Sequence, residues 1–147
     1  GVMTDGRIYL DGRGEETKVF DVRDGYGLKR VMDAGIEVAI ITGRSSSAVD
    51  RRARELGIVE VHQGVGRKGS LLDEILRKRD LEPEAVCCVG DDIPDLPLLK
   101  RAGLAVAVAD AAVEVRDAAA VITKRRGGRG AVREVCELIL TARGLWP

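Results

Sequence analysis

The sequence predicts an α/β fold, a Rossmann-like three-layer sandwich with a mainly parallel sheet. Short apolar runs, unbroken by polar residues, recur along the chain, which is typical of strands buried on both faces. The segments between these runs place apolar residues at helical spacing, and several of them stop at a glycine. Because strand and helix alternate through the 147 residues without an internal repeat, we expect a single domain over residues 1–147.

A β-hairpin is expected first, over residues 7–22. Arg7–Leu10 alternates as one strand, residues 11–14 (Asp-Gly-Arg-Gly) have turn chemistry, and Thr17–Val22 returns as a second strand. Helical periodicity then predicts helices at residues 26–34, 45–56, 70–79, 96–101, 111–119 and 130–143. The apolar runs predict strands at residues 38–41, 59–62, 85–89, 104–108 and 121–122.

Composition excludes several classes of protein. The 24 basic and 24 acidic residues give a formal net charge of zero, which argues against a nucleic-acid arm or a polybasic membrane anchor. Aromatic residues make up only 3% of the chain, too few for a platform that stacks bases. No apolar run approaches the roughly 18 residues of a membrane span, and no signal peptide opens the chain. We therefore expect a cytoplasmic protein with no nucleic-acid or membrane partner.

The cysteines and the single histidine are expected to be structural. Cys87 and Cys88 are adjacent inside an apolar run, and with Cys136 they make an odd count. That pattern fits neither a disulfide framework nor a zinc site, so we expect buried, small hydrophobic residues in a reducing compartment. His62 ends a predicted strand, where a structural or solvated role is favoured over a functional one.

A hydroxyl and a cation follow two successive strands of the predicted sheet. Residues 42–44 (Thr-Gly-Arg) come directly after the strand at 38–41, and Lys68 comes shortly after the strand at 59–62. Ligands of open parallel sheets collect at the carboxyl ends of the strands. There a hydroxyl and helix-start N–H groups bind phosphate oxygens, and a lysine neutralises charge on a transferred group. Taken alone, Thr42 is better explained by a turn and an N-cap, and Lys68 by a solvated side chain.

Three carboxylates follow the next strand. Asp91, Asp92 and Asp95 lie within five residues, where they repel one another unless a cation or water screens them. Oxygen ligands of this kind suit Mg²⁺. Asp92 or Asp95 could instead cap the short helix that follows. Together with Thr42 and Lys68, the three carboxylates predict one pocket for a phosphate ester and a magnesium ion.

The same set of residue types occurs in phospho-receiver domains, which also carry acidic residues, a threonine and a lysine on an α/β sheet. In those domains the acidic pair comes early and the lysine last. Here Thr42 and Lys68 precede residues 91–92, so the order disfavours a receiver.

Residues 42–44, Lys68 and residues 90–95 (Gly-Asp-Asp-Ile-Pro-Asp) resemble the second, third and fourth motifs of the haloacid dehalogenase superfamily of phosphatases. More narrowly, the chain is similar to the 3-deoxy-D-manno-octulosonate 8-phosphate phosphatases, enzymes of lipopolysaccharide biosynthesis. Further stretches similar to that family lie in order along nearly the whole chain, at residues 4–7, 20–27, 51–53, 62–65 and 127–134.

The resemblance implies Mg²⁺-dependent hydrolysis of a phosphomonoester of an acidic sugar. Thr42 would bind the phosphoryl group, and Lys68 would hold both that group and the nucleophile. Asp91 would ligate Mg²⁺, with Asp92 and Asp95 supporting the metal site.

The resemblance also implies how the sugar acid is recognised. Gly43 and Arg44 would contact the substrate, and Arg44 would favour an octulosonate because related nononate phosphatases carry a glutamate there. Arg52 could reach the sugar acid from the next helix. The family assembles as a homotetramer through its hairpins, and the glycine-rich segment around Arg129 could close over a neighbour's active site.

One motif of the family is absent from the sequence. The family's Asp-x-Asp-Gly ends the first, central strand and supplies a nucleophile and a general acid and base. Gly1 aligns with the glycine just after that pair, and Asp5 comes too late to replace it. We therefore expect that the start was trimmed or misassigned, with Met3 taken as an initiator, or that the remaining strands close the gap or borrow an edge. The alternative function is a non-catalytic remnant that binds phosphate or metal or serves assembly.

Overall fold

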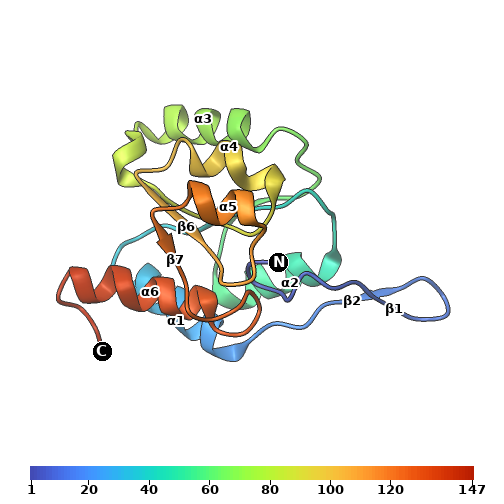
Figure 1. Cartoon of the computed structure of the whole chain (residues 1–147). Helices are drawn as coiled ribbons and strands as arrows, with labels where there is room; N and C mark the ends of the chain where they lie inside the picture. Colours follow the sequence, from blue (N-terminus) through green and yellow to red (C-terminus); the bar gives the residue numbers. More distant parts are fainter.

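The computed structural model describes residues 1–147 and confirms the α/β architecture (Figure 1). Two parallel sheets carry the strands of the body. β3 (Ala39–Ile41) pairs with β4 (Glu60–His62), and β5 (Cys87–Gly90), β6 (Leu104–Ala107) and β7 (Val121–Ile122) pair in that order. No ladder joins β3 to β5 within residues 1–147.

Helices cover both faces of the sheets, as a three-layer sandwich requires. Their bounds are α1 (Val22–Asp33), α2 (Ser47–Leu56), α3 (Lys68–Arg79), α4 (Leu96–Leu99), α5 (Val113–Ala118) and α6 (Ala131–Ala142), with 3₁₀ turns η1 (Pro83–Ala85) and η2 (Ile93–Asp95). One core cluster joins α1, α2 and α6 to Ile40 and Val61, and another joins α3 and α4 to Ile41 and Cys88. Figure 1 shows α1 and α6 together below the strands and α3 with α4 above them.

Apolar aliphatic side chains fill the core, and the cysteines belong to it. Val106 and Val115 are fully buried, and Cys136 is buried between α1 and α6. All three cysteines are free, and burial raises the pKa of the Cys87 thiol to about 11 and the pKa values of the Cys88 and Cys136 thiols to about 12. The thiols are therefore uncharged at neutral pH, as expected of small hydrophobic residues.

The predicted hairpin is present but shorter than the pattern suggested. β1 (Tyr9–Leu10) and β2 (Glu16–Thr17) pair antiparallel and project from the body (Figure 1). The second strand was predicted to reach Val22, but α1 begins there, because the Asp21 carboxylate accepts a hydrogen bond of 2.8 Å from the Arg23 N–H and caps the helix. The other predicted elements are observed with ends shifted by a few residues.

The first residues of the chain lie between the two halves of the core. Val2 packs against the cluster of α1, α2 and α6 and also against the cluster around β6 and α5. Its carbonyl accepts a hydrogen bond of 2.9 Å from the Gly128 N–H. Gly128 has a φ of +70°, and a Cβ there would overlap the backbone of Thr4 and Asp5. The glycine-rich stretch thus lets two backbones approach closely.

A buried carboxylate joins α1 to α6. Asp24 is only 2% exposed, and it accepts a hydrogen bond of 2.9 Å from the Arg133 N–H in the first turn of α6. Gly130, the residue before α6, has no side chain to cap that helix, so Asp24 acts as its cap from another helix. Burial raises the pKa of Asp24, an effect that the hydrogen bond from Arg133 only partly offsets.

None of the helices has both the length and the apolar character needed to cross a membrane.

Replacing Gly128 with alanine is expected to lower the free energy of unfolding by about 3 kcal/mol, since the left-handed backbone and the overlap with residues 4–5 both oppose a side chain. Gly14→Ala is the matched control, because Gly14 has a φ of +79° but open space around it. In this control the free energy of unfolding, measured by urea denaturation, should fall by only about 1 kcal/mol. Equal losses in the two variants would show that the close approach contributes nothing.

Candidate active site

One pocket of about 390 Å³ lies where β3, β4 and β5 end. Three loops supply its lining, one after each strand. The lining residues are Thr42, Gly43 and Arg44, then Val65, Gly66 and Lys68, then Asp91, Asp92, Pro94 and Asp95. The predicted convergence of the hydroxyl, the lysine and the carboxylates at one edge of the fold is therefore observed.

The loop after β3 is fixed to the loop after β4 by backbone hydrogen bonds. The Thr42 N–H donates to the His62 carbonyl at 2.9 Å, and the Thr42 carbonyl accepts from the Val65 N–H at 3.1 Å. The Thr42 hydroxyl has no partner within the chain, so it is available to a ligand in the pocket. The His62 ring bonds to Glu60 at 2.9 Å and does not line the pocket, in line with a structural role.

A buried ion pair joins the loop after β4 to the loop after β5. The Lys68 ammonium donates to an Asp95 carboxylate oxygen at 2.6 Å, and the two side chains are 12% and 8% exposed. The other Asp95 oxygen accepts from the N–H groups of Asp91 at 2.9 Å and Asp92 at 3.3 Å. Burial opposes ionisation of Asp95, but Lys68 and these N–H groups outweigh it and hold the pKa of Asp95 below its ordinary value.

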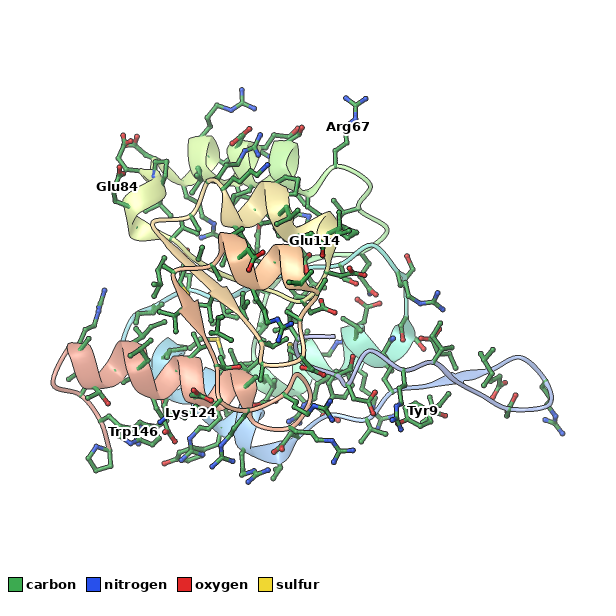
Figure 2. All side chains as sticks on the ribbon, viewed as in Figure 1. Tyr9, Arg67, Glu84, Glu114, Lys124 and Trp146 are labelled. Carbon is green, nitrogen blue, oxygen red and sulfur yellow. The ribbon has the colours of Figure 1, made fainter.

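The beginning of α3 also favours an anion in the pocket. Lys68 is its first residue, and Arg67 before it provides no side-chain cap, so the first N–H groups of the helix lack that partner. Helix N-termini of this kind favour anions. The Arg67 side chain points outward, away from the body of the molecule (Figure 2), which leaves Lys68 as the lysine or arginine of this turn that lines the pocket.

The three predicted metal ligands take different positions. Asp92 caps η2, its carboxylate accepting from the Ile93 N–H at 2.8 Å, and Asp95 completes that capping box. Both therefore serve as helix caps, the alternative that the sequence left open. The Asp91 carboxylate lies 3.1 Å from the Gly1 ammonium, and burial raises the pKa of Asp91.

Asp91 fits the role of one metal ligand. It lines the pocket directly after β5, and a carboxylate oxygen is the kind of ligand that Mg²⁺ prefers. No three Asp, Glu, His or Cys side chains of residues 1–147 are grouped so that they could hold a metal ion. Asp91, Asp92 and Asp95 thus do not form a three-ligand cluster by themselves, although the sequence predicted all three at the metal site.

The predicted substrate contacts divide into two groups. Gly43 and Arg44 line the pocket. Arg52 instead lies over the Phe20 ring, 6.0 Å from its centroid, with Glu55 at 3.4 Å. Arg129 is exposed on the glycine-rich stretch. The fold of one chain does not bring Arg52 or Arg129 to the pocket.

Two residues that support the site were missed from the sequence. Gln63 accepts from the Ser46 N–H at 2.7 Å and donates to Asp50 at 2.8 Å, which fixes the start of α2 beside the pocket loops. Glu16 forms an ion pair with Arg44 at 2.9 Å. No signal in the sequence pointed to this pair, because Arg44 is 28 residues from Glu16 in the chain and Glu16 lies outside the predicted second strand.

Replacing Asp95 with alanine is expected to lower the free energy of unfolding by about 3 kcal/mol at pH 7, since Lys68 loses its buried partner. A carboxyl whose folded pKa is lowered stabilises the fold above its unfolded pKa, and this stabilisation is lost as the pH falls through the folded value. The difference in free energy of unfolding between the parent and the variant, measured by urea denaturation, should therefore shrink below about pH 4.

Asp92→Ala is the control for Asp95→Ala and should cost about 1 kcal/mol, the typical cost of a lost exposed cap. A pH-independent difference for Asp95→Ala would contradict an ionised Asp95.

Comparison with known proteins assigns the family. A family model described as haloacid dehalogenase-like hydrolase matches residues 55–134. The 3-deoxy-D-manno-octulosonate 8-phosphate phosphatase KdsC of Salmonella typhi is 49% identical over 144 residues, which cover 98% of this chain and 77% of the relative. The KdsC of Escherichia coli strain K12 is 48% identical over 144 residues, which again cover 98% of this chain and 77% of the relative.

Solved structures agree with that assignment. The 3-deoxy-D-manno-octulosonate 8-phosphate phosphatase of Moraxella catarrhalis, in complex with magnesium, phosphate and KDO, matches with a TM-score of 0.96 and 44% identity, over 99% of this chain and 84% of that one. The cobalt-bound Haemophilus influenzae phosphatase matches with a TM-score of 0.93 and 40% identity, over 98% and 84%. The chain belongs to the haloacid dehalogenase-like hydrolases, in the family of the 3-deoxy-D-manno-octulosonate 8-phosphate phosphatases.

Proposed function

We propose that the protein is a Mg²⁺-dependent phosphomonoesterase that acts on 3-deoxy-D-manno-octulosonate 8-phosphate or a similar acidic sugar phosphate. The observation that carries the proposal is the pocket in which Thr42, Lys68 and Asp91 meet from three loops. The Moraxella catarrhalis relative, crystallised with magnesium, phosphate and KDO, supports the same ligand classes. We further propose that residues 1–147 form one domain that works in the cytoplasm, in lipopolysaccharide biosynthesis.

The phosphoryl group is bound by the first two loops. The free Thr42 hydroxyl donates to a phosphoryl oxygen, and the Gly43 backbone lies beside it in the pocket lining. The Lys68 ammonium neutralises the charge that develops on the transferred group. Asp95 keeps that ammonium in place, at 2.6 Å, so the cation is oriented before the substrate arrives.

Magnesium, when bound, would neutralise charge on the phosphate ester and help to orient it. Asp91 would be the ligand from this chain. Asp92 and Asp95 would support it by shaping the loop, Asp92 as the cap of η2 and Asp95 as the acceptor of the Asp91 N–H.

The nucleophile and the general acid and base are assigned to the family's Asp-x-Asp pair, whose place is directly before Gly1. The Gly1 nitrogen lies 3.1 Å from the Asp91 carboxylate, so the chain at Gly1 passes beside the proposed metal ligand. Asp5 is already engaged, accepting from the Arg7 N–H at 3.0 Å and the Tyr9 hydroxyl at 2.8 Å.

The hairpin is proposed as the assembly surface of a homotetramer. Ile8, Leu10 and Val19 are each more than half exposed on or beside it, which is unusual for side chains that are strongly apolar. Arg52 and Arg129, which do not reach the pocket of their own chain, are proposed to contact substrate within such an assembly.

A second candidate, a non-catalytic module that binds phosphate or metal, is favoured by one observation. Residues 1–147 contain no Asp-x-Asp-Gly sequence, so a pocket built from them alone has no aspartate nucleophile. This second candidate function predicts binding of inorganic phosphate or Mg²⁺ without turnover, whatever residues precede Gly1.

Phosphate release with Mg²⁺ separates the two candidates. Residues 1–147 alone should release none, whereas a protein extended before Gly1 by the family's Asp-x-Asp motif and its strand should hydrolyse the sugar phosphate. Thr42→Val in the extended protein should lower kcat about 100-fold, as expected for the loss of one donor to the transition state. Thr141→Val, on the exposed side of α6, is the control and should change nothing. An extended protein that is inert on all sugar phosphates would refute the phosphatase.

A further inference from the structure

Glu16 lies between two cations beside the pocket. One oxygen of its carboxylate is 2.7 Å from the Lys18 ammonium, and the other is 2.9 Å from Nη2 of Arg44. The Glu16 and Lys18 side chains are only 17% and 12% exposed. The two cations, Lys18 first, lower the pKa of Glu16. The hairpin thus contacts the pocket through the ion pairs Lys18–Glu16 and Glu16–Arg44.

The alternation of the hairpin's second arm accounts for this placement. Glu16, Lys18 and Phe20 are half-buried, whereas Thr17 and Val19 between them are exposed. Inward positions of a strand usually carry apolar residues, because a buried charge is costly without a partner. There the Lys18 ammonium balances the charge of Glu16 without a well-aligned hydrogen bond to its Oε1, and the other Glu16 oxygen accepts from Arg44.

Arg44 depends on Glu16 for its orientation. Its side chain is 57% exposed, lines the pocket and has no other side-chain partner in the chain. A free arginine side chain loses considerable conformational entropy when it binds a ligand. Glu16 holds only Nη2, so the remaining N–H groups of the guanidinium stay available for a carboxylate. Lys18 balances the charge of Glu16, so the three groups together keep one positive charge.

We propose that Glu16 is a positioning residue that orients Arg44 at the rim of the pocket, so that the hairpin sets how strongly the site prefers acidic over neutral phosphate esters. This inference rests on the proposed phosphatase function. Glu16 acts through Arg44 and does not touch the substrate.

The test is the selectivity of Glu16→Gln in the active, extended protein. The variant keeps the shape of the side chain but loses its charge. The ratio of kcat/KM for the sugar acid phosphate to kcat/KM for a neutral sugar phosphate should fall about tenfold, mainly through KM for the acidic ester. Activity on the neutral ester should stay within about twofold, because the phosphoryl-binding residues are untouched.

Two controls isolate the pairing. Glu15→Gln makes the same change at the exposed neighbouring position and should leave the selectivity unchanged. In an Arg44→Ala background, Glu16→Gln should have no further effect, since a residue that acts through Arg44 has nothing left to orient. An equal loss on both esters, an unchanged ratio, a higher ratio or an additive double variant would each overturn the inference.

A measurement that needs no turnover separates this inference from the proposed function. The Nε–H of Arg44 is followed by nitrogen-15 relaxation in the parent and in Glu16→Gln, without ligand. The inference predicts an ordered group in the parent and a mobile one in the variant. If Arg44 loosens in the variant but no ester is hydrolysed, the phosphatase proposal fails and the positioning stands. If the order of Arg44 is the same in both proteins, the positioning fails whatever the activity.

Discussion

The buried ion pair between Lys68 and Asp95 is the contact on which the pocket depends. It joins the start of α3 to the loop after β5, and the same carboxylate orders the backbone of Asp91 and Asp92. A charge pair removed from water stabilises a fold only when its remaining hydrogen bonds are satisfied, and Asp95 meets that condition with three donors. The Lys68 ammonium is thereby held in place before any ligand binds, which is what electrostatic preorganisation of a phosphoryl site requires.

The rest of the architecture brings the other loops to that pair. The two parallel sheets end at one edge, and hydrogen bonds between Thr42 and its neighbours after β4 fix the first loop. Residues 1–3 lie between the two halves, and the glycine-rich stretch around Gly128 accepts them at backbone contact distance. The hairpin projects outward (Figure 1) yet touches the pocket through Glu16, so its outer surface and the site are physically connected.

Local chemistry explains how much the sequence could predict. Apolar runs and glycine stops located the body's strands and helices within a few residues, and the strand-end rule brought Thr42, Lys68 and Asp91 together correctly. The sequence could not assign separate roles to Asp91, Asp92 and Asp95, because spacing alone does not distinguish a metal ligand from a helix cap. In the structure Asp92 and Asp95 cap η2, and Asp95 also pairs with Lys68, which its spacing in the sequence does not reveal. Glu16 was missed because its partner Arg44 is 28 residues away in the chain.

The central claim, that these loops form one site for an anionic ester and a divalent cation, is tested most directly by a crystal structure of the protein with inorganic phosphate and Mg²⁺. We expect phosphate oxygens within hydrogen-bonding distance of the Thr42 hydroxyl and the Lys68 ammonium, and Mg²⁺ on the Asp91 carboxylate. Phosphate bound elsewhere on the surface, or Mg²⁺ held by Asp92 with Asp91 unengaged, would contradict it.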